Sequence, residues 1–302
     1  MQINNPICFI KEEIIMKKFL ALILAALMLV SFAACAAEPA ETEPAEGETA
    51  TAPADDKADD KAEEKSVVVG YTIYEPMNYM KDGELVGFDT DLAKAVFEKL
   101  GYKVLFKEID WDQKYTELNS GTIGCIWNGF TANTSDDDGV ARADKVDFSY
   151  NYMGNKQVIV AKADFVKEIK DTKSFAGKVG AVENGSAGAT FLTEKLEGAI
   201  KKGVTSQLDA MKELSLGQVD FVVLDEQLAK AYVGKGDYAG LEISDKVESE
   251  AEYYAIGFKK GSDLTAKVNG ALEELAADGT IAKLAKEYGV ENTAITDFAD
   301  QK

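Results

Sequence analysis

Residues 217–225, GQVDFVVLD, contain the pattern that decides the fold. The run from Phe221 to Leu224 is apolar without a break, and Asp225 follows it. An unbroken apolar run of strand length is typical of a strand buried on both faces of a sheet. Gly217 stands where a preceding helix would end. The stretch therefore predicts a helix end, a buried strand, and a carboxylate at the strand's carboxyl end.

An earlier stretch echoes this pattern. Residues 118–126, LNSGTIGCI, match residues 214–222, LSLGQVDFV, in their leucine, their glycine and their strand. The first strand runs into the polar loop 128–131, NGFT, and the second into 225–227, DEQ. Helix–glycine–strand junctions are common, so the match is compatible with chance or with two related lobes. Two such lobes would face one cleft, because open α/β sheets bind ligands beyond the carboxyl ends of their strands.

The folded region starts at about Ser66, and strand and helix patterns alternate along it. Residues 67–69 and 104–109 have strand patterns, and the helix between them is expected to be capped by residues 88–91 and to end at Gly101. Residues 123–127 form a further apolar strand pattern. This alternation predicts an α/β fold with parallel sheets covered by helices on both faces.

The segment that precedes the folded region has a different composition. Residues 36–65 contain eleven acidic residues, three lysines and three of the five prolines, and no valine, isoleucine, leucine or aromatic residue. Such a segment cannot bury a core, and its like charges repel one another. An extended acidic tether is expected here.

The N-terminal part has the pattern of a secretory signal. A basic start, MKK at 16–18, is followed by the apolar run 19–32 and by AAC at 33–35. The last three residues resemble the lipobox of bacterial lipoproteins, with Cys35 as the diacylated first mature residue. Phe32 stands where the lipobox usually has leucine.

Two alternatives concern this N-terminal part. Residues 19–37 just reach the length of a membrane span, so a transmembrane anchor is the competing interpretation. Residues 1–15 include two glutamates, which do not suit the start of a signal, so translation is expected to begin at Met16. Cys8 would then not belong to the protein.

Composition excludes several classes of function. The 302 residues suggest about two domains. With 33 basic and 53 acidic residues the net charge is -20, which repels nucleic-acid phosphates. The absence of histidine excludes Ser-His-Asp and Cys-His catalysis and histidine metal ligands. Three cysteines cannot make a disulfide framework or a four-cysteine zinc site. We expect no metal, no cofactor and no nucleic-acid partner.

Several short motifs, taken in chain order, resemble family 3 of the bacterial solute-binding proteins, the amino-acid receptors of ABC importers. They are Pro76 with residues 82–89 (DGELVGFD), residues 128–131 with Arg142 and 146–149 (VDFS), residues 217–225, residues 257–264 (GFKKGSDL) and residues 278–280 (DGT). The resemblance covers nearly the whole folded region.

The resemblance implies a two-lobed, periplasmic-binding-protein-like fold of type II, in which two hinge strands join two Rossmann-like lobes. The expected organisation is a signal peptide at 1–34, the lipidated cysteine and tether at 35–65, lobe one at 66–156 plus 252–302, and lobe two at 157–251. The second hinge strand is expected near residues 253–256.

The implied function is capture of an extracytoplasmic amino acid and its delivery to the permease and ATPase of an ABC importer. The protein would be a monomeric, non-enzymatic receptor, anchored by lipid to the outer face of the cytoplasmic membrane. Two alternatives on the same fold stay open: a cyclohexadienyl or arogenate dehydratase, and a sensory ligand-binding domain.

The resemblance implies that Arg142, which precedes the motif at 146–149, binds the amino acid's α-carboxylate, and its planar fork suits bidentate binding. The alternative is that it neutralises the surrounding aspartates 136–138 and 144. The family usually has three to five residues between the threonine and this arginine, whereas here residues 132–141 make ten. The insert, residues 134–139, could displace the arginine or extend the rim of the cleft.

By the same resemblance Asp225 would bind the α-amino group, although an aspartate before a helix is often its N-cap. The Gly129 carbonyl would join it, and Thr131 would serve the carboxylate. Ser186 and the Ala187 N–H would meet that carboxylate from lobe two, because a helix N-terminus favours an anion. Ser186 could also be only an N-cap.

The remaining candidates surround the ligand's side chain. Tyr74 and Trp111 stand where the resembled family has aromatic residues, so they are expected as flat walls, with ordinary core burial as the alternative. Asn128 and Glu75 are candidates for its distal end. Cys125, in a strand, is expected to be a small buried hydrophobic residue. The cargo stays open, because no acidic cluster can be assigned to the side-chain subsite from Glu75, Glu183 or Glu226.

Overall fold

The computed structural model describes residues 65–301. The expected signal peptide, Cys35 and acidic tether lie outside these residues. The described residues belong to one compact unit, which contains every strand, helix and hydrophobic cluster described below. In residues 65–301 we find no helix with the length and apolar character required to cross a bilayer.

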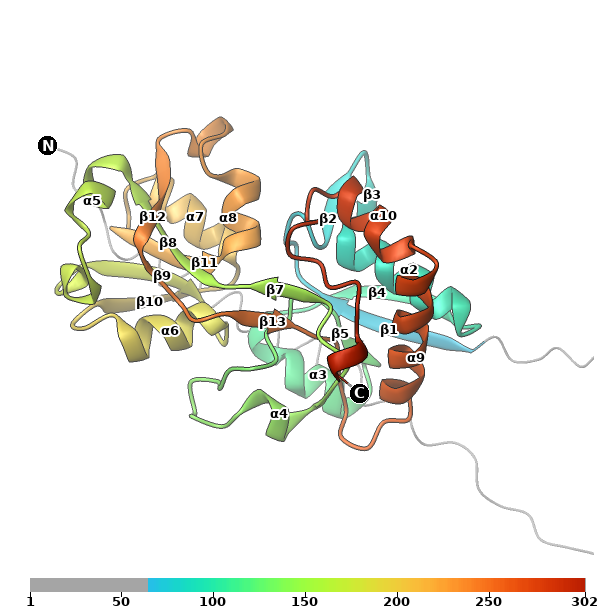
Figure 1. Ribbon diagram of the computed structural model, residues 1–302. Helices are drawn as coiled ribbons and strands as arrows, with labels where there is room; N and C mark the ends of the chain where they lie inside the picture. Colours follow the sequence, from blue (N-terminus) through green and yellow to red (C-terminus); the bar gives the residue numbers. More distant parts are fainter. Residues whose placement is uncertain (1–64, 302) are drawn as a thin grey trace, which may run out of the picture. The chain divides into compact units, whose positions relative to one another are not determined.

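The first sheet has five strands and belongs to lobe one. Its order is β4-β1-β5-β14-β6, in which β1 pairs in parallel with β4 and β5, and β14 is antiparallel to β5 and β6. The strands are β1 (Ser66–Tyr71), β4 (Lys103–Glu108), β5 (Cys125–Ile126), β6 (Asp147–Phe148) and β14 (Gly257–Phe258). Helices α2 (Phe88–Lys99), α9 (Leu264–Ala277) and α10 (Thr280–Glu287) pack against one another beside it, as Figure 1 shows.

The second sheet also has five strands and belongs to lobe two. Its order is β10-β9-β11-β8-β12, with β9 parallel to β10 and β11, and β8 antiparallel to β11 and β12. The strands are β8 (Gln157–Lys162), β9 (Val179–Glu183), β10 (Ile200–Val204), β11 (Phe221–Asp225) and β12 (Leu241–Glu248). The helices are α5 (Ala163–Glu168), α6 (Ala187–Lys195), α7 (Gln207–Ser215) and α8 (Glu226–Tyr232).

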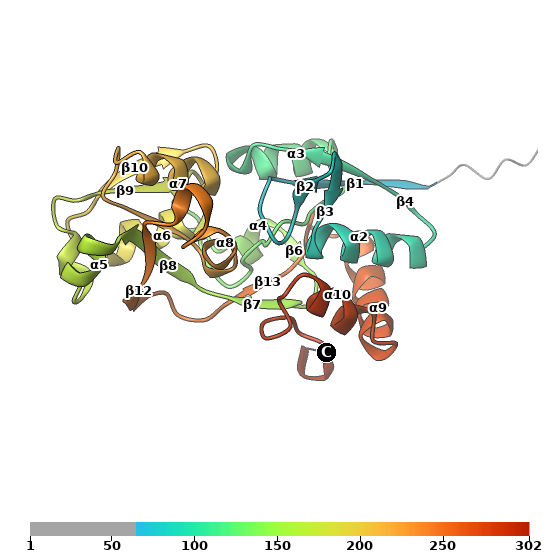
Figure 2. The ribbon, with the colours of Figure 1, turned by 90° about the horizontal axis from the view of Figure 1, so that it is seen from above.

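Two short strands join the lobes. β7 (Met153–Asn155) and β13 (Glu252–Tyr254) pair antiparallel, with Glu252 opposite Asn155. Figures 1 and 2 show both strands running from one sheet to the other. The fold is therefore two-lobed α/β, with a connection of two strands.

The remaining elements are short. They are the hairpin β2 (Tyr79–Lys81) and β3 (Glu84–Val86), helices α3 (Lys114–Ser120) and α4 (Arg142–Lys145), and 3-10 turns at Trp111–Gln113, Thr172–Phe175, Gly236–Tyr238 and Ala299–Gln301.

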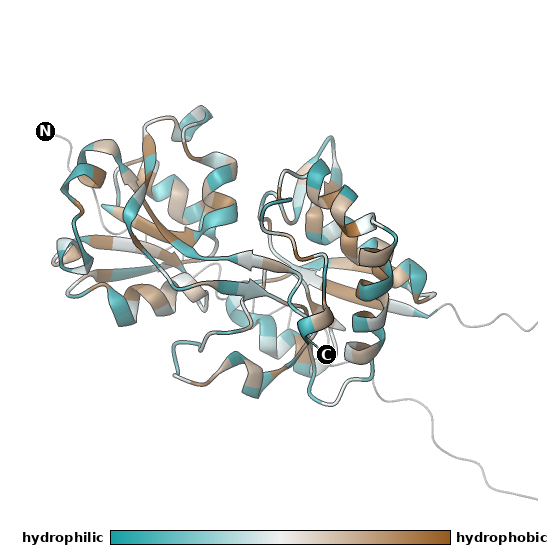
Figure 3. Ribbon diagram, viewed as in Figure 1, coloured by the Kyte–Doolittle hydropathy of each residue, from teal (hydrophilic) through white to brown (hydrophobic). Residues whose placement is uncertain are grey.

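The decisive strand β11 is buried on both faces, as its sequence predicted. Val222 and Leu224 belong to one hydrophobic cluster, and Phe221 and Val223 belong to another on the opposite face. All five residues of the strand are buried. Figure 3 shows brown, the hydrophobic colour, along β8 and β11 of this sheet. The two buried faces hold Asp225 at a fixed place at the strand's end.

The glycines of the two matching stretches, Gly121 and Gly217, both follow the end of a helix. Gly121 (φ +77°) follows α3 and Gly217 (φ +73°) follows α7, and a positive φ is the conformation that glycine tolerates best. Each helix therefore ends where the sequence predicts. The strand expected at 123–127 is shorter, since only Cys125–Ile126 pair.

The expectation that residues 88–91 cap the first long helix is wrong. Gly87 stands at the cap position of α2, and no side chain there makes a capping hydrogen bond. Asp89 instead is fully buried and accepts from the Gly129 N–H at 2.8 Å and the Tyr152 hydroxyl at 2.9 Å. Burial raises the pKa of Asp89 to about 7 despite these bonds. This carboxyl group therefore fixes the loop after β5.

Candidate ligand-binding site

One small pocket collects the expected site residues from both lobes. Its lining consists of Tyr74, Trp111, Asn128, Gly129, Thr131, Arg142, Glu183, Ser186, Ala187, Gln207 and Asp225. Nine of these eleven are the candidates named from the sequence. The free space among them is about 10 Å³, close to the 10–15 Å³ or so that a single water needs. The lobes are therefore closed tightly on this pocket.

Strand ends place the charged residues. Asp225 ends β11 and Glu183 ends the neighbouring parallel strand β9, so both carboxylates stand at the same edge of the second sheet. The loop 128–131 follows β5 of the first sheet. This arrangement is the expected one for α/β lobes that bind ligands beyond the carboxyl ends of their strands.

Arg142 is almost completely buried and is held from several sides. Its Nε donates to Asp136 Oδ1 at 2.8 Å, Nη1 to the Thr131 carbonyl at 3.2 Å, and Nη2 to the Gly185 carbonyl at 3.1 Å. Its guanidinium also lies over the Phe130 ring, 5.1 Å from the centroid. These contacts with described residues use three of the five N–H bonds. One N–H on each terminal nitrogen remains without a contact to the described residues. Two such N–H bonds are the number that bidentate binding of a carboxylate needs.

The insert does not displace this arginine, because the inserted chain folds back on itself. The Arg142 N–H donates to the Thr134 carbonyl at 3.0 Å, and Ser135 and Ala141 form a β-bridge. Asp136 and Val140 close the loop with a hydrogen bond of 3.1 Å. The side chain therefore returns to the Thr131 carbonyl. Arg142 does pair with one aspartate of the acidic run, so this part of the alternative is correct.

Asp225 is held by three side-chain amides. Its Oδ1 accepts from Asn155 at 2.6 Å and from Gln157 at 2.7 Å, and Oδ2 accepts from Gln207. Asp225 does stand at the N-cap position of α8, as the alternative expected, but its side chain makes no capping hydrogen bond to that helix. Burial raises the pKa of Asp225 in spite of these donors. The carboxylate is thus oriented from behind and faces the pocket.

Glu252, on the connecting strand β13, is tied to the same amides. Its Oε2 accepts from Gln157 at 2.9 Å, from Asn155 at 3.3 Å and from the Thr131 hydroxyl at 3.2 Å. Burial, together with the charge of Asp225, raises its pKa to about 7. The connection between the lobes is therefore bonded directly to residues of the pocket.

Two further charged residues were not placed at the site by sequence. Glu183 is buried, and burial together with the charge of Asp225 raises its pKa to about 8. Lys114 is also buried; its Nζ donates to the Gly185 carbonyl at 3.0 Å and lies 5.0 Å from the Trp111 ring centroid. Burial, reinforced by the charge of Arg142, lowers the pKa of Lys114 to about 8. The position of Glu183 at a strand end was an available signal, whereas a lysine opening a short helix usually indicates surface.

Glycine is required where the pocket's backbone turns closely. Gly129 has φ +56°, and a Cβ atom there would lie 2.6 Å from the Tyr74 ring. Gly185 has φ +67°, and a Cβ atom there would lie 3.1 Å from Lys114 Nζ and 3.2 Å from Asp112 Oδ1. Both glycines let parts of the pocket approach more closely than any side chain would allow.

Tyr74 and Trp111 were expected either as walls of the site or as ordinary core residues. Both descriptions apply, because the two side chains are buried and also line the pocket. The Tyr74 hydroxyl lies 2.6 Å from that of Tyr254, and Trp111 packs edge-on against Phe130 at 5.4 Å. Each ring is fixed by a neighbour within the core. A wall held in this way is rigid before any ligand arrives.

Ser186 is the N-cap of α6, since its hydroxyl accepts from the Ala189 N–H at 3.1 Å. The same residue lines the pocket, so the two expected roles are compatible. Ala187 opens the helix beside it.

The amide of Asn128 is committed elsewhere. Its Nδ2 donates to the Thr72 carbonyl at 2.9 Å and to Asn78 Oδ1 at 2.7 Å, and its Oδ1 accepts from the Thr72 hydroxyl. Both amide hydrogens are therefore used inside lobe one.

Two other candidates lie outside the pocket lining. Glu75 is not among the pocket residues and instead contacts Tyr232 of α8. Cys125 is fully buried, and burial raises the pKa of its thiol.

Comparisons by family model, by sequence and by structure all find amino-acid-binding or solute-binding proteins. The model of the bacterial extracellular solute-binding proteins, family 3, matches residues 67–291. The arginine-binding extracellular protein ArtP of Bacillus subtilis is 29% identical, over 90% of this chain and 98% of its own length. The L-cystine-binding protein TcyA of the same organism is 32% identical, over 71% of this chain and 77% of its own. An ancestral arginine-binding protein solved with arginine has a TM-score of 0.67 and 35% identity, covering 74% of this chain and 98% of its own.

Proposed function

Because the chain belongs to family 3 of the bacterial extracellular solute-binding proteins, we propose that it captures a free amino acid outside the cytoplasm and delivers it to the permease of an ABC importer. The observation that carries this proposal is the pairing of Arg142 and Asp225 in one buried pocket. A guanidinium with two available N–H bonds and a carboxylate held from behind are complementary to the two ends of a zwitterion.

Each pocket residue then has a role. Arg142, with the Thr131 N–H and the N-terminus of α6 at Ser186 and Ala187, binds the α-carboxylate, since the Thr131 hydroxyl already donates to Glu252. Asp225 and the Gly129 carbonyl bind the ammonium group. Tyr74 and Trp111 flank the side chain, and Asn128 supports the loop beneath it. Each charge-assisted hydrogen bond contributes about 1.5–3 kcal/mol, so four or five provide the roughly 8 kcal/mol of micromolar binding after association costs.

Entry of cargo requires the lobes to separate. The free space of about 10 Å³ holds no amino acid. Movement about β7 and β13 would open the pocket, since these strands are the connection between the two sheets. Lobe one offers Arg142, Gly129 and Thr131 first, and closure adds Asp225 and Ser186.

We further propose that the cargo carries a positive side chain. Around the pocket, Arg142 and Lys114 face the carboxyl groups of Asp225, Glu183 and Glu252, while Asp136 has Lys145 as an additional partner. The carboxyl groups exceed the cations by one. Burial raises the pKa of all three carboxyl groups, and the charge of Asp225 adds to the increase at Glu183 and Glu252. A cation bound among them would stabilise their ionised forms. The arginine named for two of the relatives agrees with this assignment.

The proposed organisation of the chain follows the sequence. Residues 1–34 are a signal peptide, and residues 35–65 are the lipidated Cys35 and its tether. Lobe one comprises 66–156 plus 252–302, and lobe two comprises 157–251. The receptor acts as a monomer, held by its lipid at the outer face of the membrane beside the permease and ATPase.

A thermal-shift screen tests the proposal. Residues 61–302 form one compact unit with complete cores and are suitable as a soluble fragment. The twenty amino acids, ornithine, citrulline and cystine would be added singly. A ligand at a thousandfold excess over Kd stabilises the folded state by about 4 kcal/mol, and we expect the largest shift with arginine, lysine or ornithine. No shift with any amino acid, or turnover of arogenate or prephenate, would contradict the proposal.

A further inference from the structure

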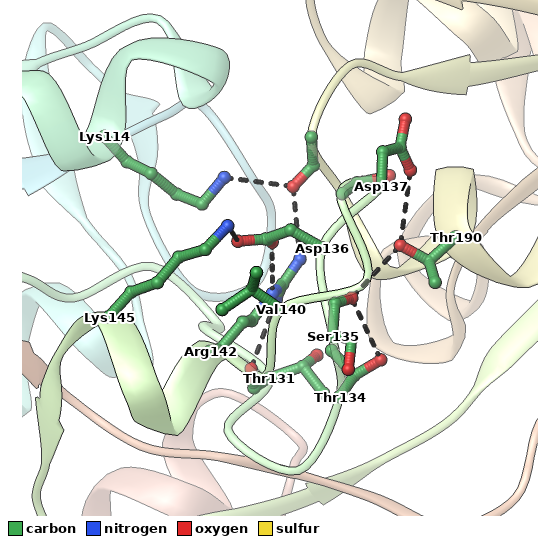
Figure 4. A network of polar contacts seen from close by, with 12 residues as sticks. Lys114, Thr131, Thr134, Ser135, Asp136, Asp137, Val140, Arg142, Lys145 and Thr190 are labelled. Atoms are coloured by element: carbon green, nitrogen blue, oxygen red, sulfur yellow. Dashed lines mark hydrogen bonds and ion pairs between the residues drawn. The ribbon is translucent and has the colours of Figure 1, made fainter.

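The loop of residues 134–141, here called the clasp loop, contacts both lobes. It belongs to lobe one in the chain, yet two of its residues bond to α6 and β10 of lobe two. Figure 4 shows the loop lying between Arg142 and Thr190, with polar contacts on both sides. The inserted residues therefore form part of the contact between the closed lobes.

Asp136 attaches the clasp loop to lobe one. This buried carboxylate pairs with Arg142 Nε and Lys145 Nζ, both at 2.8 Å, and accepts from the Tyr115 hydroxyl at 2.6 Å. Burial alone would raise its pKa, but Arg142, together with hydrogen bonds from Lys145 and Tyr115, lowers the pKa to about 2. The loop and the proposed carboxylate ligand Arg142 are thus held as one unit.

Asp137, the next residue, bonds to lobe two. Its Oδ1 accepts from the Thr190 hydroxyl at 3.3 Å, and its Oδ2 pairs with Lys201 Nζ. The Thr190 hydroxyl also donates to the Ser135 carbonyl at 3.2 Å. Thr190 is buried and Lys201 is one-third exposed. Neighbouring carboxylates of one loop therefore bind opposite lobes.

We propose that the clasp loop slows the opening of the closed lobes, with Asp137, Lys201 and Thr190 as the contact that must break. Contacts between lobes exist only when the lobes are together, so they affect the rate of opening more than the rate of encounter. The effect on cargo release depends on the proposed function, whereas the effect on lobe opening does not. Because Asp136 pairs with Arg142, the contact also holds the proposed carboxylate ligand in position.

Dissociation kinetics test the clasp on residues 61–302. Stopped-flow measurements would compare wild type with Asp137→Asn, Lys201→Gln and the double variant, using the amino acid that gives the largest thermal shift. Partly exposed ion pairs are weak, so each single variant should raise the dissociation rate about two- to tenfold. The dissociation rate of the double variant should equal that of each single variant, because both substitutions remove the same ion pair. Association rates should stay within about twofold.

Asp138→Asn is the matched control. Asp138 is in the same loop, but its ion pair is with Lys145 of lobe one. This variant should leave the dissociation rate at the wild-type value. Exchange of the charges, Asp137→Lys with Lys201→Asp, should restore slow release. Wild-type rates in both single variants, or an equal acceleration by Asp138→Asn, would overturn the proposal.

A second measurement needs no ligand. Spin labels on cysteines placed at the exposed positions Glu98 of α2 and Glu194 of α6 would report the separation of the lobes. Without amino acid, Asp137→Asn should shift the distance distribution toward longer values than wild type, and Asp138→Asn should not. Identical distributions for wild type and Asp137→Asn would contradict the clasp. This result stands even if no amino acid binds and the proposed function fails.

Discussion

Arg142 donates from Nη2 to the carbonyl oxygen of Gly185 at 3.1 Å, and this bond joins the two lobes inside the pocket. The residue proposed to bind the cargo's carboxylate therefore also bonds to lobe two. Closure and carboxylate capture use the same guanidinium, so changes at this side chain should affect both.

Arg142→Lys should weaken amino-acid binding by about 1.5–3 kcal/mol, because lysine keeps the charge but cannot bind a carboxylate bidentately. Isothermal titration would measure the change. The amide derivative of the same amino acid lacks the carboxylate. Its affinity should therefore fall much less between wild type and Arg142→Lys. Equal losses for acid and amide would remove Arg142 from the carboxylate site.

Asp225→Asn should reduce affinity by about 2–5 kcal/mol, since the cargo's ammonium would lose its opposite charge in a buried site. The variant keeps the size of the side chain. Asp245→Asn is a suitable control, because its side chain is 81% exposed and pairs with the adjacent Lys246. Unchanged binding by the Asp225 variant would exclude it as the ammonium ligand.

Glu183→Gln should change selectivity more than general affinity. Loss of a buried negative charge should weaken the binding of arginine by about 1.5–3 kcal/mol. Citrulline, which is uncharged, should bind as well as before or better. Competition titrations with both ligands measure the ratio. Glu226→Gln serves as control, because Glu226 is outside the pocket lining. A constant ratio in the Glu183 variant would contradict the cationic cargo.

Binding of a cationic amino acid should depend on pH. Burial raises the pKa of Glu183 to about 8 and of Glu252 to about 7, so near neutrality Glu183 is mostly protonated and Glu252 about half protonated before cargo binds. A cation favours their ionised forms, so binding releases protons and weakens as the pH falls from about 8 to about 6. Titration in two buffers of different ionisation enthalpy counts the protons. Proton uptake, or none, would disagree with this account.

Gly129→Ala should destabilise the fold by about 1–3 kcal/mol, because the new methyl group meets the Tyr74 ring and the backbone needs a positive φ. Gly101→Ala separates the two effects. Gly101 has φ +71° with nothing within 4 Å of its Cβ position, so that variant carries the backbone cost alone. Urea unfolding would compare the two, and equal losses would mean that the contact with Tyr74 is unimportant.

The family resemblance supplied most of the site residues, and strand patterns indicated where some of them lie because such patterns are local. Asp225 and the loop at 128–131 could be placed at strand ends from apolar runs and glycines alone, and both lie in the pocket. Gln207 could not be found, since it opens α7 and reaches Asp225 only through the packing of that helix on the sheet. The burial of Lys114 depends on Gly185 of the other lobe. Such contacts arise between distant segments and leave no local pattern.

Contacts between distant segments also explain why the start of α2 was predicted inaccurately. Residues 89–91 have the composition of a cap, but Asp89 is drawn into the core by Gly129 and Tyr152, which lie far away in the chain. The function of the insert was equally hidden. Its acidic run gives no sign that Asp136 and Asp137 bond to different lobes.

Gly185 suggests a way to hold the two lobes of the receptor apart. A Cβ atom at this position would press on Lys114 and Asp112 of the opposite lobe, at 3.1 and 3.2 Å. A bulky residue would therefore act as a wedge that prevents full closure while leaving Arg142 and its loop intact. Importers that recognise only closed receptors would ignore this form, so it would separate scavenging of the nutrient from its uptake by the cell.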